Sequence, residues 1–261
     1  MAFVSSLSVS STSSLLSSLK SFLVSTCAWT LIDTGVSGLA ENFVVKSPGA
    51  SGDRNIYLKF GASSAELSGI SCWAADGFAS ATDVTSNATT ERVLSVNSGG
   101  SLTAFFEGDA DHVIVGTNKG ANTTIATWVY GGLTQEYTPS VASVPNQSVL
   151  VTGIDVGGVT TGRAVESPTG TYNTALLVDS FASAHLNKSD PNLLDGLVYL
   201  WPMLVTINGS DRMLGTLRNA YAVGQAIVHN TVLTASGQDY IVFNSVNGGG
   251  ASGASLAVKN S

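Results

Sequence analysis

The stretch that most constrains the fold lies near the middle of the chain, at residues 104–138. Residues 112–117 form a short segment rich in β-branched side chains, and Asn118-Lys119-Gly120 follows it. Because Asn and Gly tolerate positive φ, this tripeptide is typical of a tight turn. Residues 122–130 then alternate between two faces, and Gly131-Gly132 ends the run. The pattern predicts a β-hairpin with one strand long enough to lie inside a sheet.

An N-terminal amphipathic helix is predicted after the serines at residues 10–14, which are N-cap candidates. Apolar residues then recur with a helical period, and serines lie on the opposite face. The apolar face comprises Leu15, Leu16, Leu19, Phe22 and Leu23. The helix should end near Ser25.

Short β-segments separated by turn residues fill most of the remaining chain. Residues 1–138 are interpreted as the helix followed by about seven strands with antiparallel spacing. A Pro-containing boundary at 139–146 precedes a second β-rich lobe, so the lobes are 1–138 and 139–261. A flexible Gly-rich link at 248–253 precedes a last strand at 255–258. The predicted fold is mainly β (α+β), with antiparallel β-sheet or sandwich lobes and one N-terminal helix.

The chain is unusually poor in charge. Of its 261 residues, 44% are hydrophobic and only 11% are charged, against about 25% charged residues in an average soluble domain. The surface is either covered by partners in an assembly or that of a secreted β-protein rich in hydroxyl groups. We favour the assembly, because a free soluble protein usually keeps more surface charge.

The balance of charge and the apolar runs disfavour two kinds of partner. The 18 acidic and 11 basic residues give a net charge of −7, whereas a surface that grips phosphates needs clusters of Lys and Arg. No apolar run approaches the ~20 residues of a transmembrane helix, and the first residues lack the basic start of a signal peptide. We expect no sequence-specific nucleic-acid binding, no membrane partner, and synthesis in the cytoplasm without export.

Few side chains suggest chemistry. Glu107, Asp109 and Asp111 alternate beside His112, but a calcium loop normally supplies more ligands, so we expect these acids to face solvent. No G-x-S-x-G elbow is present. The histidines, which share no local spacing, are His112, His185 and His229. We therefore predict no catalytic residue, no cofactor and no metal site, and a protein that is not an enzyme.

Cys27 and Cys72 each lie one or two residues before a tryptophan, Trp29 and Trp73, in apolar surroundings. Buried free thiols are the favoured interpretation, and a single disulfide is the alternative.

The tryptophans in or beside predicted strands are Trp73, Trp128 and Trp201. They could form a sugar-stacking platform, but we favour the core or a subunit interface, where large aromatic residues contribute most of the burial energy. The interface candidates are Trp128, Tyr130, Trp201, Ser255, Leu256, Ala257 and Val258.

The order of four motifs resembles a family of virion structural proteins of tailed bacteriophages. The first is the N-terminal helix followed by Trp29-Thr30-Leu31, and the second is a PG-x-x-G-D loop, Pro48 to Asp53, before Ile56-Tyr57-Leu58. The third joins Asp111-His112-Val113-Ile114-Val115 through a hairpin to Tyr130-Gly131-Gly132-Leu133 and Pro139. The fourth joins Leu214-Gly215-Thr216-Leu217 to Tyr221-Ala222-Val223-Gly224 and Asp239-Tyr240-Ile241-Val242-Phe243-Asn244. The chain departs from the family at 140–147, where a Tyr/Pro-rich run is expected and only Pro145 is present.

This resemblance implies a non-enzymatic virion protein of the phage neck or tail, forming a homo-oligomeric ring or collar. Its partners would be copies of itself and other neck or tail proteins, joined by shape complementarity and main-chain pairing. The alternative is a carbohydrate- or receptor-binding β-module of a phage fibre or baseplate.

Overall fold

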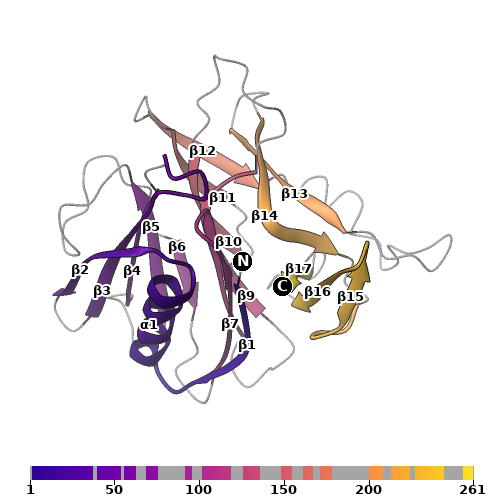
Figure 1. The fold of residues 1–261 in the computed structure, drawn as a ribbon, viewed down its shortest axis with the longest axis horizontal. Coiled ribbons are helices and arrows are strands. Elements are labelled where there is room, and N and C mark those ends of the chain that lie inside the picture. The colour runs from indigo at the N-terminus through magenta and orange to yellow at the C-terminus, as the bar shows by residue number, and fades with distance from the viewer. Residues whose placement is uncertain are drawn as a thin grey trace.

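A computed structural model shows a mainly antiparallel β-protein with one α-helix, which confirms the predicted fold class (Figure 1). The structure describes residues 2–37, 40–53, 56–62, 69–75, 92–95, 102–118, 126–135, 148–154, 161–166, 171–177, 200–207, 213–223, 227–243 and 255–260.

The strands that the structure describes form two antiparallel sheets. The five strands of the smaller sheet are, in spatial order, β2 (Thr30–Ser37), β3 (Ala40–Ser47), β4 (Ile56–Ala62), β5 (Gly69–Ala75) and β6 (Arg92–Ser95). The twelve strands of the larger sheet are, in spatial order, β1 (Ala2–Val9), β7 (Leu102–Gly108), β8 (His112–Asn118), β9 (Ala126–Leu133), β10 (Ser148–Ile154), β11 (Thr161–Glu166), β12 (Thr171–Leu177), β13 (Trp201–Ile207), β14 (Met213–Val223), β17 (Ser255–Asn260), β16 (Gln238–Phe243) and β15 (Val232–Ala235).

The larger sheet crosses the predicted domain boundary. Strand β9, before the boundary, and strand β10, after it, are hydrogen-bonded neighbours, with Leu133 opposite Val149. The strands of the two predicted lobes therefore share one sheet. Only the smaller sheet and the helix come entirely from the first lobe.

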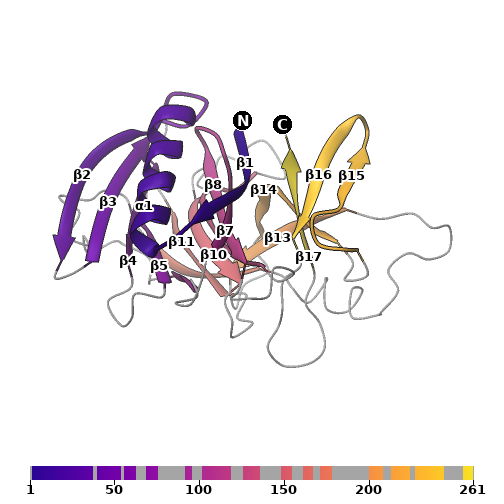
Figure 2. The same ribbon diagram turned by 90° about the horizontal axis from the view of Figure 1, so that it is seen from below.

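Strands β7, β8 and β9 lie between two cores, because alternate residues of each strand point to opposite faces. Phe106, Val113 and Val129 pack in the core that contains the helix and the smaller sheet. Phe105 and Ile114 pack in a second core, against β14, β16 and β17. Figure 2 shows this order of layers, with the helix and smaller sheet on one side of these strands and β14–β17 on the other.

The second core closes because the larger sheet bends back on itself. The rings of Phe105 on β7 and Phe243 on β16 stack with centroids 3.7 Å apart, and the ring of Phe3 on β1 lies 6.5 Å from that of Phe243. Strands far apart in the sheet order therefore face each other across one apolar interior.

The helix α1 (Thr12–Ser21) continues into a π-helical turn, η1 (Phe22–Thr26), close to the predicted end. Ser11 caps α1: the Ser14 N–H donates to Ser11 Oγ at 3.1 Å, and the Ser11 N–H donates to Ser14 Oγ at 3.0 Å. No helix in the described part of the chain is long and apolar enough to cross a membrane.

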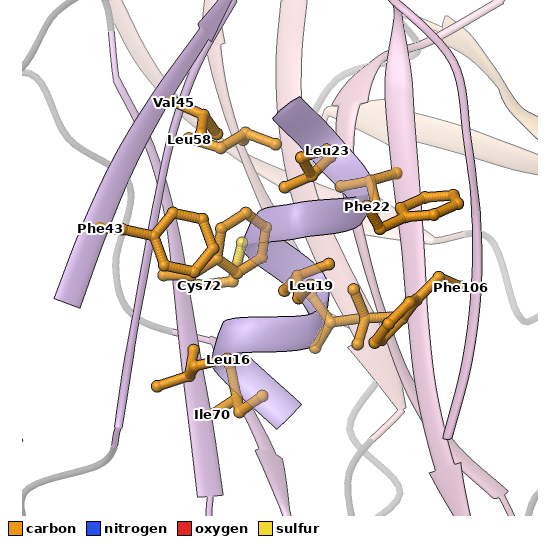
Figure 3. Packing of buried hydrophobic residues seen from close by; sticks show 14 of the residues in the cluster. Leu16, Leu19, Phe22, Leu23, Phe43, Val45, Leu58, Ile70, Cys72 and Phe106 are labelled. Carbon is orange, nitrogen blue, oxygen red and sulfur yellow. The ribbon is translucent and has the colours of Figure 1, made fainter. Parts of the chain in front are cut away.

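The five residues of the predicted apolar face are all buried, which confirms the helix prediction. Figure 3 shows Leu16 beside Ile70 of the smaller sheet and Phe22 beside Phe106 of the larger one. The rings of Phe22 and Phe106 lie 5.5 Å apart. The helix thus fills the wedge between the two sheets.

The predicted last strand is β17, and it pairs within its own chain. Tyr221 of β14 lies opposite Ala257, and Ile241 of β16 lies opposite Val258. Because β17 has a hydrogen-bonded neighbour on each side, it occupies an interior position in the sheet rather than an exposed edge.

Some strands of the structure were not predicted from the sequence. We predicted no strand at β1, β11 or β15; β1 has an irregular register between Val4 and Leu7, and β15 has only four residues. The predicted features at 119–125, 139–146 and 248–253 lie outside the described residues.

Replacing Leu19 by Ala should lower the free energy of unfolding by about 2–5 kcal/mol, because a buried leucine is truncated in a packed core. Leu19 is 0% exposed. Urea unfolding measures the change. Ser17→Ala, on the exposed face of α1, is the matched control and should change stability by less than about 0.5 kcal/mol. A similarly small loss for Leu19→Ala would contradict this packing.

Deleting residues 248–261 should lower the melting temperature by at least about 10 °C, since it removes core side chains at positions 256 and 258 and separates β14 from β16. Thermal unfolding followed by circular dichroism measures this effect, with deletion of Ser261 alone as the control. An unchanged melting temperature would show that β17 does not stabilise this chain.

Candidate functional site

A cluster of titratable side chains in the described part of the chain is built around the short loop that joins β7 to β8. Asp109 shapes this loop: its N–H donates to the carbonyl of His112 at 3.0 Å, and its Oδ1 accepts the N–H of Asp111 at 2.8 Å. An Asp side chain that accepts the amide two residues on is a common way to fix a tight turn.

Residues just before β2 and at or just after the end of β3 form hydrogen bonds to this loop. The indole Nε1 of Trp29 donates to the carbonyl of Asp109 at 2.6 Å. The hydroxyl of Ser47 donates to the carbonyl of Ala110 at 2.5 Å, and the N–H of Ala50 donates to Asp111 Oδ1 at 2.8 Å. The loop is thereby tied to the segments that begin β2 and end β3.

His112 lies between two carboxylates in the interior. Its Nε2 is 2.8 Å from Glu107 Oε2, and its Nδ1 is 3.0 Å from Asp109 Oδ1. The side chains of His112 and Glu107 are both 0% exposed. A ring that donates to carboxylates from both nitrogens is a protonated imidazolium.

The surroundings of His112 stabilise that charge. Burial would lower the pKa of His112, but the charge of Glu107 and the hydrogen bonds to Asp109 and Glu107 outweigh it and raise the pKa to about 9. Burial would raise the pKa of Asp109, but its hydrogen bond and charge interaction with His112, with two backbone hydrogen bonds, lower it to about 2. The His112–Asp109 pair is therefore ionised at neutral pH.

A bulge in strand β14 positions the remaining partners of Glu107 and Asp111. Between the paired positions Thr216 and Tyr221, β14 carries four residues where β13 carries only Met203, and Asn219 within this bulge has a φ of +57°. The bulge lets Asn219 Nδ2 donate to Glu107 Oε1 at 2.9 Å. Arg218 places a guanidinium nitrogen 2.9 Å from Asp111 Oδ2.

Gly132 allows the β7–β8 loop to pack closely against β9. Its φ is +136°, and a Cβ there would lie 2.4 Å from the carbonyl oxygen of Asp111. The next residue, Leu133, donates its N–H to that carbonyl at 2.9 Å. Any side chain at position 132 would displace the loop, since backbone atoms cannot move aside cheaply.

This arrangement favours a structural role over a catalytic one. The imidazole of His112 has no free lone pair with which to accept a proton, because both nitrogens donate to carboxylates. No group of three or more His, Cys, Asp or Glu side chains in the described ranges is placed to hold a metal ion. The cluster instead joins the smaller sheet, β7–β9 and β14 at one point; we call it the β7–β8 hub, consisting of Glu107, Asp109, Asp111, His112, Arg218 and Asn219.

The expectation that the three acids face solvent is wrong for Glu107 and Asp111. Glu107 is 0% exposed and Asp111 is 8% exposed, because each has a charged partner inside the fold. The contribution of Arg218 and Asn219 was not predicted, since they are more than 100 residues away in sequence from His112 and Glu107. A local signal was present, because Glu107 lies two residues after Phe105 in an apolar strand and therefore on the same face.

The structure places the interface candidates in two different settings. Trp128 and Tyr130 are 0% exposed and pack in the second core. Leu256, Ala257 and Val258 are likewise buried in β17, and Ser255 pairs with Val223. Trp201 alone among the seven has a described exposed side chain, at 46%.

Cys27 and Cys72 are free and buried, which confirms the favoured interpretation. Burial raises the pKa of Cys27, with smaller contributions from the charges of Asp109 and Glu107, to about 12. Burial also raises the pKa of Cys72 well above its ordinary value. Both thiols are protonated and unreactive at neutral pH.

No family model and no curated protein matches the chain.

We predict that stability falls as the pH rises from about 6.5, the pKa of an unfolded histidine, through about 9, the pKa of His112 in the fold. Between these values the native state binds a proton that the unfolded state has lost, so the slope approaches about 1.4 kcal/mol per pH unit. Urea unfolding at several pH values measures this slope.

Glu107→Gln should weaken that pH dependence, because it removes the charge that most raises the pKa of His112. Glu41→Gln, at an exposed position, is the control and should keep the slope of the unmodified chain. Equal slopes in all three proteins would show that His112 is not the titrating group.

Proposed function

We propose that this chain is a non-enzymatic structural protein of a tailed-bacteriophage virion and forms a homo-oligomeric ring or collar in the neck or tail. The observation that carries the non-enzymatic part is the β7–β8 hub. Its histidine, its acids and its arginine are engaged with one another inside the fold. The chemistry of these side chains therefore serves to hold three parts of the molecule together.

The virion part rests on the ordered motifs that resemble phage structural proteins. The two halves of the third motif meet in the fold, because β8 and β9 are neighbours and the rings of His112 and Tyr130 lie 5.5 Å apart. The fourth motif, around Leu217, joins them, since the backbone N–H of Arg218, the next residue, donates to the hydroxyl of Tyr130 at 3.4 Å. The motif residues are thus framework residues, which suits a protein whose task is shape.

The composition supports assembly. Only 11% of the residues are charged, and the net charge is −7. A negative surface also suits a conduit through which DNA passes without being gripped. The partners proposed are copies of this chain and other neck or tail proteins, with the mature protein located in the virion.

The alternative, a sugar- or receptor-binding module, receives less support. A stacking platform needs an exposed aromatic face; Trp128 is 0% exposed, and Trp201, at 46%, is the one of the three tryptophans with an exposed side chain. Trp73 is half-buried, with the ammonium group of Lys59 5.1 Å from the centre of its ring.

The native mass of the purified chain tests the proposal. A closed oligomer is expected by analytical ultracentrifugation, because ring components bury complementary surfaces between identical copies. Purified virions should contain the chain in a fixed copy number by quantitative mass spectrometry. A monomer at micromolar concentration, or absence from virions, would contradict the proposal.

A further inference from the structure

The larger sheet closes on itself at one narrow place. Strand β9 has β8 and β10 as hydrogen-bonded neighbours, and just past its end Gln135 pairs with Thr216 of β14. The N–H of Gln135 donates to the carbonyl of Thr216 at 2.8 Å, and the N–H of Thr216 donates to the carbonyl of Gln135 at 2.9 Å. Because β10–β13 lead from β9 round to β14, this bridge joins strands that are far apart in the sheet order.

The closure consists of a single residue pair, whereas β8 and β9 pair along their whole lengths. It also requires a glycine. The φ of Gly215 is +139°, and a Cβ there would lie 2.3 Å from the carbonyl oxygen of Gln135. Because that oxygen belongs to the backbone, a side chain at position 215 would push β14 away from the bridge. Few main-chain hydrogen bonds therefore hold the two strands together.

Residues 216–219 of β14 lie where its ladders with neighbouring strands are interrupted. The ladder with β13 stops at Thr216 and resumes at Tyr221, and the ladder with β17 begins only at Ala220. The contacts described for this stretch run to β9 and to the β7–β8 hub. The backbone N–H of Arg218 donates to the hydroxyl of Tyr130, and the side chains of residues 218 and 219 contact Asp111 and Glu107 at 2.9 Å each.

Opening at this place breaks the bridge and the contacts with the hub, but no ladder between strands. Folded proteins open locally where few buried contacts and few main-chain hydrogen bonds hold a segment. We propose that residues 216–219 form a latch, which detaches from β9 and from the hub as a unit while the ladders of β14 with β13 and β17 stay intact. The latch is a property of the fold and does not depend on the proposed virion role.

Leu217 and Asn219 set the balance between the closed and the open latch. Leu217 is 2% exposed and packs in the second core, so its burial keeps the closed state dominant. Asn219 has a φ of +57°, a conformation that is unfavourable for a residue with a Cβ. Its hydrogen bond to Glu107 helps to hold it there. The open latch is therefore a minor state, and the hub controls its population.

Native-state hydrogen exchange of the Gln135 and Thr216 amides tests the latch, because their hydrogen bonds make the bridge. Both should exchange faster than the slowest amides of the β8–β9 ladder. Their exchange should also depend only weakly on urea, since a local opening exposes little surface. If they instead show the steep urea dependence of the β8–β9 amides, the bridge opens only when the whole fold unfolds, and the latch is overturned.

Asn219→Gly tests the role of the hub, because it removes the hydrogen bond to Glu107 and keeps a backbone that glycine adopts without strain. Exchange of the two bridge amides should become at least about tenfold faster, as expected when a hydrogen bond to a charged group is lost. Asn230→Gly is the matched control, at an exposed position with a φ of +64°, and should leave these amides unchanged. Equal rates in both variants would contradict control by the hub.

Leu19→Ala separates the latch from global unfolding. Leu19 packs in the first core, which stays folded when the latch opens. The variant should therefore speed exchange of the slowest β8–β9 amides, which report global unfolding, and leave the bridge amides unchanged. Parallel acceleration of both sets would overturn the latch. Should Leu19→Ala fail to fold, the urea series on the unmodified chain decides the question alone.

Discussion

The fold depends on three neighbouring strands, β7, β8 and β9, being apolar on both faces. One face carries Phe106, Val113 and Val129 toward the helix, and the other carries Phe105 and Trp128 toward β14, β16 and β17. A strand with one polar face could support only one core. Because these strands exclude water on both sides, the helix wedge and the curled end of the larger sheet can pack on a common layer.

A layer buried on both faces leaves little room for polar groups, and the β7–β8 hub shows how the few present are accommodated. Glu107 and His112 lie on the face toward β14, at the margin of an apolar core. A buried charge without a partner would strongly destabilise the fold. Any rearrangement that separates a buried charge from its partner is therefore costly as well. The hub therefore restricts how the smaller sheet, the central strands and β14 can be placed relative to one another, and a positive φ at Asn219 is accepted to complete it.

Charged side chains are also few in the chain as a whole, at 11% of the residues. Charged side chains that are present inside the fold pair with each other, as Arg218 does with Asp111, or lie over aromatic rings, as Lys46 does over Tyr57 at 5.2 Å. The segments 21–40 and 219–238, which carry most of the exposed large apolar side chains in the described chain, contain one charged residue, Asp33.

Local periodicity was sufficient to predict the helix, its buried face, most strands and the buried thiols, because each depends on residues within one or two turns or one strand length. The sheet order was beyond such patterns: it joins β9 to β10 across the expected boundary and inserts β17 between β14 and β16. The same limit explains why Trp128 looked available to a partner and Glu107 looked solvated. Their burial depends on β14 and β16, whose residues lie about 90 to 140 positions further along the chain, and contacts at that separation arise only when the sheet has curled back on itself.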